Sequence, residues 1–234
     1  MPTFTVTGEI DPFLHVSLNR GESIYCESNA MVMMEDTLDL SGRAQGGITQ
    51  ALFRRFANGE SFFQQHIEAT RGEGDCLLSP TLPGAMEVLE VGAAQYSLSD
   101  GVYVAATSGV QVTARSQGLG NAIMGSTGGF MIGQTSGQGQ LVVSGFGALF
   151  TLDVKPGKTT IIDNGHVVAW DSRLTYDVSA ATAQNKGLFG NLVNSMTTGE
   201  GVVLRFNGSG KVIVCSRNRD SFVTWLSSRI SASN

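Results

Sequence analysis

The amino-acid sequence predicts an all-β protein with minor helices, in which short strands form a sandwich, a barrel or a β-helical roll. Two observations lead to this fold class. Many short segments rich in β-branched residues alternate with glycine turns, and two turn signatures each occur three times along the chain. Charged residues make up only 15% of the 234 residues, which fits a compact chain. We therefore expect a single domain over residues 1–234.

The first turn signature opens three units of about seventy residues. Its opening residues are Asn29, Gly101 and Gly165. They lie 72 and 64 residues apart, and glycine and asparagine tolerate the positive φ of a tight turn. A valine stands three positions after each of them, where it favours the strand that follows. Apolar residues nine and eleven positions after the opener complete the signature.

The second signature is a Gly-x-Gly that leads into an apolar run near the end of each unit. It consists of Gly72 and Gly74, Gly137 and Gly139, and Gly208 and Gly210. Its first glycines lie 65 and 71 residues apart, so two independent markers predict internal repeats at approximately 3–80, 81–146 and 147–216. In the middle unit, Ser108 and Gly109 also fit the opening turn, but the register that starts at Gly101 keeps an apolar pair ahead of the turn.

Helical spacing within the units is limited to three short inserts. Residues 47–57, 119–124 and 188–196 are apolar, flanked by glycine and spaced as one face of a helix. These inserts either cap the open ends of the β fold or form an oligomer or partner surface. The candidate interface residues on them are Leu52, Phe53, Ile123, Met124, Leu188 and Phe189.

A longer helix is predicted at the C-terminal end, over residues 217–234. Asp220 is the expected N-cap, and Phe222, Leu226 and Ile230 would share one face.

Composition and charge argue against several classes of protein. The net charge of −5 does not provide the basic surface with which proteins hold nucleic acid. Cys26, Cys76 and Cys215 are odd in number, widely spaced and set in apolar runs. We expect free core thiols in a cytoplasmic protein, with neither a disulfide framework nor a zinc ribbon. No apolar run approaches the length of a membrane span, and the N-terminus does not resemble a signal peptide.

The sequence contains no recognisable catalytic constellation. Residues 156–160 resemble the end of a phosphate-binding loop but lack its first glycine and its helix. The three histidines form no close pair of the kind that ligates metals, so we predict neither a metal nor a cofactor. His166, Trp170 and Asp171 occur together only in the third unit. They are candidate ligand-binding residues for a small molecule inside the β fold.

Six motifs, in the order and spacing found here, resemble one known family. They are Leu18-x-x-Gly21-Glu22-Ser23-Ile24, Gly59-Glu60-Ser61-Phe62-Phe63, Leu82-Pro83-Gly84, Val154-x-Pro156-Gly157, Asn164-Gly165-His166-Val167-Val168-Ala169-Trp170 and Gly199-Glu200-Gly201-Val202-Val203. Over nearly its whole length the chain resembles the bacterial and archaeal proteins of unknown function related to the yeast "altered inheritance of mitochondria" protein. The resemblance implies a double-stranded β-helix similar to the subunit of the trp RNA-binding attenuation protein, assembled into homo-oligomers and without established enzymatic activity. The middle unit departs from the family at Gly92-Ala93-Ala94, where a proline-glycine turn is usual.

The repeats, the missing catalytic constellation and the resemblance together favour a non-enzymatic homo-oligomeric interaction or scaffold protein. Three units in one chain favour a trimer or a ring, with an unknown protein as further partner. The alternative is a small-molecule binder or cupin-like enzyme that uses the interior of the β-helix. RNA binding is a remote third reading, suggested only by the likeness to the attenuation protein.

Overall fold

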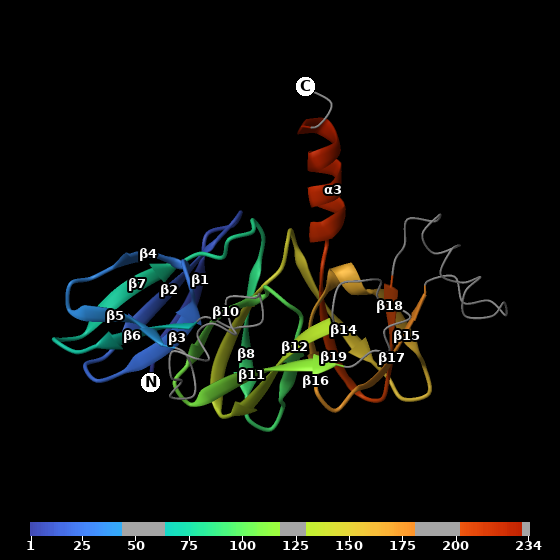
Figure 1. The fold of residues 1–234 in the computed structure, drawn as a ribbon. Coiled ribbons are helices and arrows are strands. Elements are labelled where there is room, and N and C mark those ends of the chain that lie inside the picture. The colour runs from blue at the N-terminus through green and yellow to red at the C-terminus, as the bar shows by residue number, and fades with distance from the viewer. Residues whose placement is uncertain (44–63, 118–129, 181–201, 231–234) are drawn as a thin grey trace.

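The computed structural model describes residues 1–43, 64–117, 130–180 and 202–230, and it confirms the all-β class. These residues form four antiparallel sheets, a 3₁₀ helix, η1 (Asn164–His166), and an α-helix, α3 (Arg219–Ile230). An N-terminal strand, β1 (Thr3–Thr7), precedes three sets of six strands, which we call the N-terminal, middle and C-terminal units (Figure 1).

The three units follow one another along the chain. The N-terminal unit comprises β2 (Phe13–Leu18), β3 (Ser23–Glu27), β4 (Met31–Met34), β5 (Leu38–Arg43), β6 (Gln64–Ala69) and β7 (Gly74–Leu78). The middle unit comprises β8 (Met86–Val91), β9 (Tyr96–Leu98), β10 (Tyr103–Thr107), β11 (Val110–Gln117), β12 (Phe130–Gly137) and β13 (Gly139–Ser144). The C-terminal unit comprises β14 (Leu149–Val154), β15 (Thr160–Asp163), β16 (Val167–Asp171), β17 (Thr175–Ala180), β18 (Val202–Asn207) and β19 (Gly210–Cys215).

All three units have the same pattern of strand pairing. In the N-terminal unit, β7 pairs with β2 and β4, and β6 pairs with β3 and β5. In the middle unit, β13 pairs with β8 and β10, and β12 pairs with β9 and β11. In the C-terminal unit, β19 pairs with β14 and β16, and β18 pairs with β15 and β17. Each unit therefore contains two three-stranded ladders. The sequence triplication and the double-stranded β-helix stay predictions.

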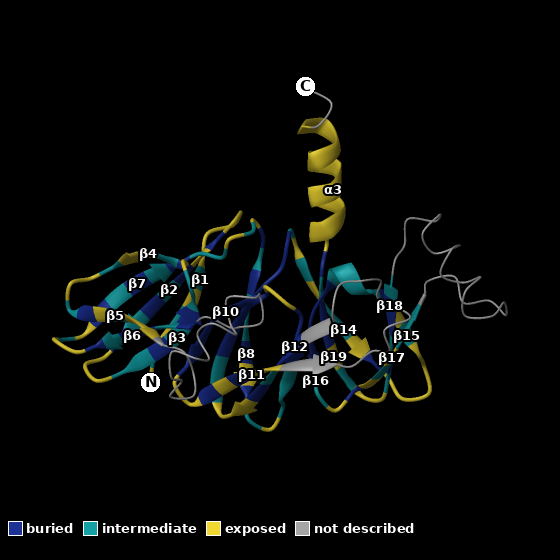
Figure 2. Ribbon diagram, viewed as in Figure 1, coloured by how far each residue is buried: buried dark blue, intermediate teal, exposed yellow. Residues whose placement is uncertain are grey.

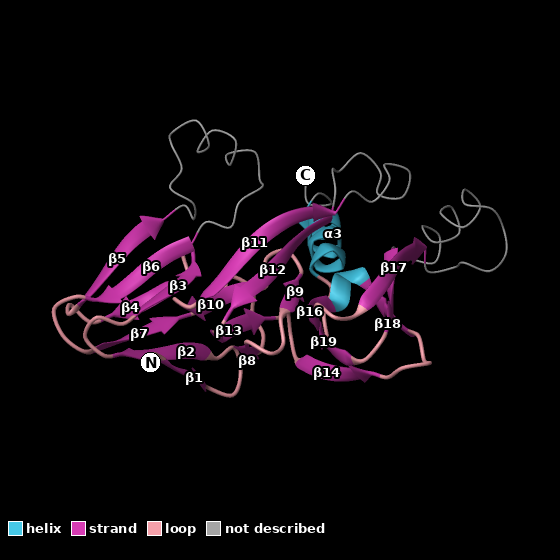
Figure 3. Ribbon diagram, turned by 90° about the horizontal axis from the view of Figure 1, so that it is seen from below, coloured by secondary structure: helices cyan, strands magenta, loops and turns pink. Residues whose placement is uncertain are grey.

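Two of the sheets run across the boundaries between units. β3 pairs with β10, so that Cys26 lies opposite Ala105, and β9 pairs with β16, so that Leu98 lies opposite Ala169. The resulting six-stranded sheets have the orders β5-β6-β3-β10-β13-β8 and β11-β12-β9-β16-β19-β14. The other two sheets lie at opposite ends of the elongated body. They are β1-β2-β7-β4 and β15-β18-β17 (Figures 1 and 3).

The predicted opening turns precede β4, β10 and β16. Asn29 and Gly101 have the expected positive φ, at 69° and 73°, and Gly109 instead lies between β10 and β11. Gly165 differs from the prediction, because it lies in η1 and its φ is not positive. A Cβ at Gly165 would lie 1.9 Å from Asn218 Nδ2. Space, and not backbone conformation, therefore requires glycine at this position.

The Gly-x-Gly signature marks the crossing between the two ladders of a unit. It lies between β6 and β7, between β12 and β13, and between β18 and β19, and in each case the two strands belong to different sheets. Gly137, Gly139 and Gly208 have positive φ values of 89°, 145° and 115°. At Gly74, a Cβ would lie 2.4 Å from Thr37 Oγ1.

The strands at the two joints between units contribute to two cores at once. β10 supplies Val104 and Ala105 to the core of the N-terminal unit, and β16 supplies Val168 and Ala169 to the core of the middle unit. Both strands are consequently buried at all five positions. The core of the C-terminal unit is aromatic and is centred on Trp170.

The C-terminal helix is present as α3, which extends away from the β body (Figure 1). Its N-cap is Asn218, because Asn218 Oδ1 accepts a hydrogen bond of 3.0 Å from the Ser221 N–H. The predicted N-cap, Asp220, instead lies in the first turn, where its charge favours the helix N-terminus. Residues 231–234 and the three predicted inserts lie outside the described residues. The candidate interface residues Leu52, Phe53, Ile123, Met124, Leu188 and Phe189 lie outside them as well.

Candidate functional site

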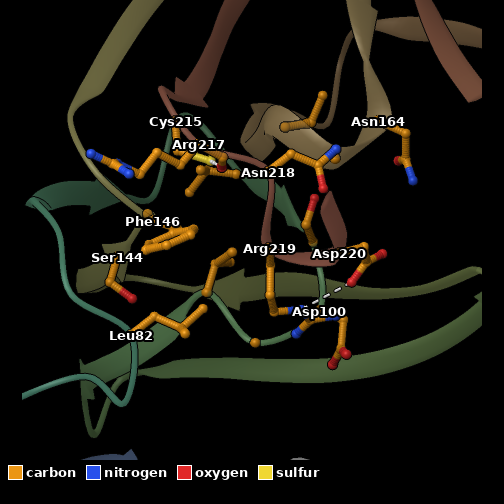
Figure 4. A pocket seen from close by; sticks show the side chains of 17 residues that line it. Leu82, Asp100, Ser144, Phe146, Asn164, Cys215, Arg217, Asn218, Arg219 and Asp220 are labelled. Carbon is orange, nitrogen blue, oxygen red and sulfur yellow. Dashed lines mark hydrogen bonds and ion pairs between the residues drawn. The ribbon is translucent and has the colours of Figure 1, made fainter. Parts of the chain in front are cut away.

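A pocket of about 130 Å³ lies where the middle and C-terminal units meet, next to the start of α3. The segments that follow β9, β13 and β19 line it together with η1. Figure 4 shows Phe146 at the left, Asp100 below and Asn164 at the upper right, with Asn218 and Asp220 from the start of α3 between them. The joint between the units therefore brings together side chains that are far apart in the sequence.

The pocket offers hydrogen-bonding groups inside and charges of both signs. Ser99 Oγ and Asn164 Oδ1 are buried and have no hydrogen-bond partner among the described residues. Buried polar atoms of this kind are costly unless a partner satisfies them. The Arg217 guanidinium lies 5.8 Å from the centre of the Phe146 ring, and Arg219 Nε lies 3.4 Å from the Asp220 carboxylate. Polar and charged residues thus line the pocket, and the two unpartnered oxygens beside it are themselves closed to solvent.

The predicted ligand residues His166, Trp170 and Asp171 do not line this pocket. His166 Nδ1–H donates to the Cys215 carbonyl oxygen at 2.8 Å. Trp170 is only 1% exposed and lies in the core of the C-terminal unit. The structure therefore does not bring the three side chains together in one cavity, and their role in ligand binding stays a prediction.

The Asp171 carboxylate has a partner two residues away. It accepts a hydrogen bond of 2.9 Å from the Arg173 backbone N–H and one of 2.5 Å from the Arg173 guanidinium. These hydrogen bonds hold the pKa of the Asp171 carboxyl below its usual value, against the opposing effect of burial. The side chain therefore stays ionised and fixes the turn between β16 and β17.

The histidine, cysteine and acidic side chains of the described ranges do not form a metal site or a reactive thiol. These ranges contain no group of three or more histidine, cysteine, aspartate or glutamate side chains placed to hold a metal ion. Cys26, Cys76 and Cys215 are buried free thiols, as predicted. Burial is the main cause that raises the pKa of Cys26 and of Cys76 to about 12. Such thiols stay protonated at neutral pH and are poor nucleophiles.

α3 presents an apolar surface to solvent. All of its residues are exposed (Figure 2), and its large apolar side chains are between 39% and 64% exposed. They are Phe222, Val223, Trp225, Leu226 and Ile230. Phe222 contacts the β body through Phe146, with 5.2 Å between the ring centres. In the described part of the chain, no helix is both long and apolar enough to cross a bilayer.

Two further apolar surfaces lie on strand edges, at opposite ends of the body. β4 is the last strand of the N-terminal sheet and β15 the last strand of the C-terminal sheet, and within the described ranges neither has a strand on its outer side. Val32 and Met33 on β4 are 53% and 41% exposed, and Ile161 on β15 is 52% exposed. An exposed apolar edge of this kind pairs readily with another strand.

These features were only partly visible in the sequence. Val32 and the Asn164-Gly165 pair belong to the turn signature, so their positions were known but their surroundings were not. Ser99 and Asn218 gave no signal, because they become pocket residues only through contacts between distant segments.

Comparison with known proteins gives the family. An uncharacterised protein of Streptococcus pyogenes serotype M6 is 33% identical over 223 residues, which cover 92% of this chain and 85% of the relative. The crystal structure of a Streptococcus pyogenes protein from a structural genomics consortium is 30% identical, with a TM-score of 0.79 over 98% of this chain and 100% of that one. The family model described as mitochondrial biogenesis AIM24 matches residues 4–217, in agreement with the resemblance found in the sequence. The chain therefore belongs to the AIM24 family.

Proposed function

We propose that this protein is a non-enzymatic, homo-oligomeric interaction or scaffold protein. The main support is α3, which extends from the β body and exposes its apolar side chains along its length. An isolated helix of twelve residues is marginal in water. Its stability would come from packing these exposed apolar side chains against a partner.

The architecture supports the same proposal. We propose that the three units are diverged copies of one double-stranded β-helical unit, since the strand pairing of each unit is the same. A chain of such units has unpaired strands at its two ends, and assembly of several copies into a trimer or ring would pair them.

The test is the mass of the native protein. Native mass spectrometry of the full chain at micromolar concentration should give a multiple of 24.7 kDa. A strictly monomeric chain would refute the proposal.

The contribution of α3 is tested by polar substitution on its apolar side. Trp225→Ser combined with Leu226→Ser should lower the assembled mass or the helical circular dichroism, because both side chains are exposed and need a partner. Ser227→Ala on the same helix is the matched control and should change neither. If the double variant behaves like the parent, α3 does not support the assembly.

The pocket favours a second candidate function, the binding of a small polar molecule. Its support is a space of about 130 Å³ lined by polar and charged residues, beside which Ser99 Oγ and Asn164 Oδ1 are buried without a hydrogen-bond partner among the described residues. Protein purified from its own host should then carry a reproducible excess mass in native mass spectrometry. Ser99→Ala should lower the occupancy, whereas His166→Ala should leave it unchanged, since His166 does not line the pocket. A protein without excess mass contradicts this function.

A further inference from the structure

We propose that β15 of one copy pairs with β4 of the next copy, so that the chains join head to tail through a continuous sheet. The sheet across the contact would have the order β17-β18-β15 from one copy and β4-β7-β2-β1 from the other. This inference rests on the homo-oligomer proposed above and specifies its contact.

The two joints inside the chain are the template for this contact. Each joint pairs the second strand of one unit with the third strand of the next, as β3 with β10 and β9 with β16. The remaining second strand is β15 and the remaining third strand is β4. Among the described residues these two strands have no neighbour on the side that the joints use. Each chain therefore has one second strand, β15, and one third strand, β4, that could form a further joint with another copy.

β4 already has the geometry of a joint strand. The pairing of β10 with β13 shifts register between Tyr103 and Ala105, and that of β16 with β19 shifts between Val167 and Ala169. The pairing of β4 with β7 shifts in the same place, between Met31 and Met33. The residue at the shift is a valine in all three strands. The free strand thus needs no rearrangement to act as its counterparts do.

The exposed fraction of its side chains distinguishes β4 from the joint strands β10 and β16. The valine at the shift is 0% exposed in both joints, at Val104 and Val168, but 53% exposed at Val32 in β4. The next position is Ala105 or Ala169 in the joints, also 0% exposed, and Met33 in β4, 41% exposed. At the joints these residues pack into the core of the preceding unit. β4 would supply Val32 and Met33 in the same way to the C-terminal unit of another copy.

The charges on the strand edges agree with this assignment. The other edge strands that follow β1 and have no outer neighbour among the described residues carry charged residues, which discourage pairing between edges. Examples are Asp39 on β5, Glu87 on β8, Asp153 on β14 and Asp177 on β17. By contrast, β4 (Met31–Met34) contains no charged residue, and β15 has only Asp163 at its end.

The ladders also give the register of the contact. Cys26, Leu98 and Ile162 occupy the same position in their units. Each is aligned, across the middle strand of its ladder, with the residue that lies four positions after Leu38, Val110 or Leu174. Cys26 and Leu98 lie opposite Ala105 and Ala169 at the joints. Ile162 should therefore lie opposite Met33 of the next copy, and Ile161 opposite Met34.

Disulfide formation between copies tests this register. Directly opposite residues in an antiparallel pair are close enough for a disulfide. Met34→Cys and Ile161→Cys proteins, co-expressed and treated with copper-phenanthroline as oxidant, should give covalent dimers. Either variant alone should give none, because the contact joins two different edges. The native thiols do not interfere, since all three are buried.

The control for position is Phe150→Cys on β14, which is 66% exposed and lies on an edge that has no outer strand among the described residues and that neither joint uses. Co-expressed with Met34→Cys, it should give no dimer. A charge provides a second test, because Ile161→Lys should lower the mass of the native assembly whereas Phe150→Lys should not. Both side chains are exposed, so neither lysine disturbs the fold of the single chain.

The outcomes separate this contact from the wider proposal. Dimers only in the mixture of Met34→Cys and Ile161→Cys, with loss of mass in Ile161→Lys, support the contact. An oligomeric parent that forms no such dimer, or an Ile161→Lys protein that keeps its full mass, overturns the contact and leaves the homo-oligomer standing. A monomeric parent overturns both.

Discussion

Replacing Trp170 by alanine tests whether this residue belongs to the core or to a ligand site. Trp170 is 1% exposed, and its ring centre lies 5.4 Å from that of Tyr176 and 5.8 Å from that of Phe206. Both rings approach the indole close to edge-on, at interplanar angles of 81° and 62°. The substitution therefore removes the centre of an aromatic cluster.

The expected cost follows from this packing. Truncation to alanine removes about 150 Å² of buried apolar surface, which at about 25 cal/mol per Å² is worth about 4 kcal/mol. The two edge-on contacts contribute about 0.5 to 1.5 kcal/mol each beyond this area. These contributions sum to about 5 to 7 kcal/mol, which is an upper estimate because the unfolded chain already buries part of this surface. We therefore expect Trp170→Ala to lower the free energy of unfolding by about 4 to 5 kcal/mol, at the upper end for buried aromatic residues.

Urea unfolding followed by circular dichroism measures this change without relying on tryptophan fluorescence. Phe150→Ala is the matched control, because the same kind of truncation at a side chain that is 66% exposed should change stability by less than about 0.5 kcal/mol. A loss below about 1.5 kcal/mol for Trp170→Ala would refute the packing described here. Unchanged stability with a loss of bound molecule would instead support a ligand site.

Three further changes test local features of the structure. Ellman's reagent at pH 8 should react with none of the three thiols of the folded chain and with all three after denaturation, because burial raises the pKa of Cys26 and of Cys76 to about 12; one fast-reacting thiol would contradict their burial. Burial, helped by the charge of Asp100, raises the pKa of the Glu27 carboxyl from 4.5 to about 6. Relative to Glu27→Gln, the parent protein is therefore most stable below pH 4.5, where this carboxyl is protonated. It loses that stability as the pH rises through 6 and the carboxyl ionises. Glu27→Gln should therefore be more stable than the parent above pH 6, on the order of 1 kcal/mol, and a gain that persists at pH 4 would argue against this cause. Gly165→Ala should displace Asn218 and reduce the helical signal of α3, since its Cβ would lie 1.9 Å from Asn218 Nδ2, whereas Gly42→Ala, with open space around it, should be neutral.

The turns and crossings were predictable from sequence because local backbone geometry determines them. Asn29 and Gly101 have the predicted positive φ, and the Gly-x-Gly signature lies at a crossing between ladders in each unit. Gly165 shows the limit of this reasoning. The same residue type at the same place in the pattern serves there to make room for Asn218, a contact across 53 residues that no local pattern reveals.

The candidate ligand residues show a second limit. His166, Trp170 and Asp171 stood out because only the third unit carries them, but alternation along a strand gives no information on which face is the core. The structure has Trp170 in the core and gives Asp171 a partner in Arg173. The pocket lies close by, but its unpartnered atoms belong to Ser99, directly after β9, and to Asn164 in η1, and neither residue type indicates a ligand site on its own.

The position of α3 adds a consequence to the head-to-tail contact. After β7 and β13 the chain continues into another set of six strands, whereas after β19 it continues into α3. α3 and the free edge of β15 are thus both found on the C-terminal unit, and every copy has one of each. A head-to-tail contact repeated around one axis relates the copies by rotation alone. In a closed ring, all copies of α3 would therefore lie on the same face, and their apolar side chains would form a single surface for a partner.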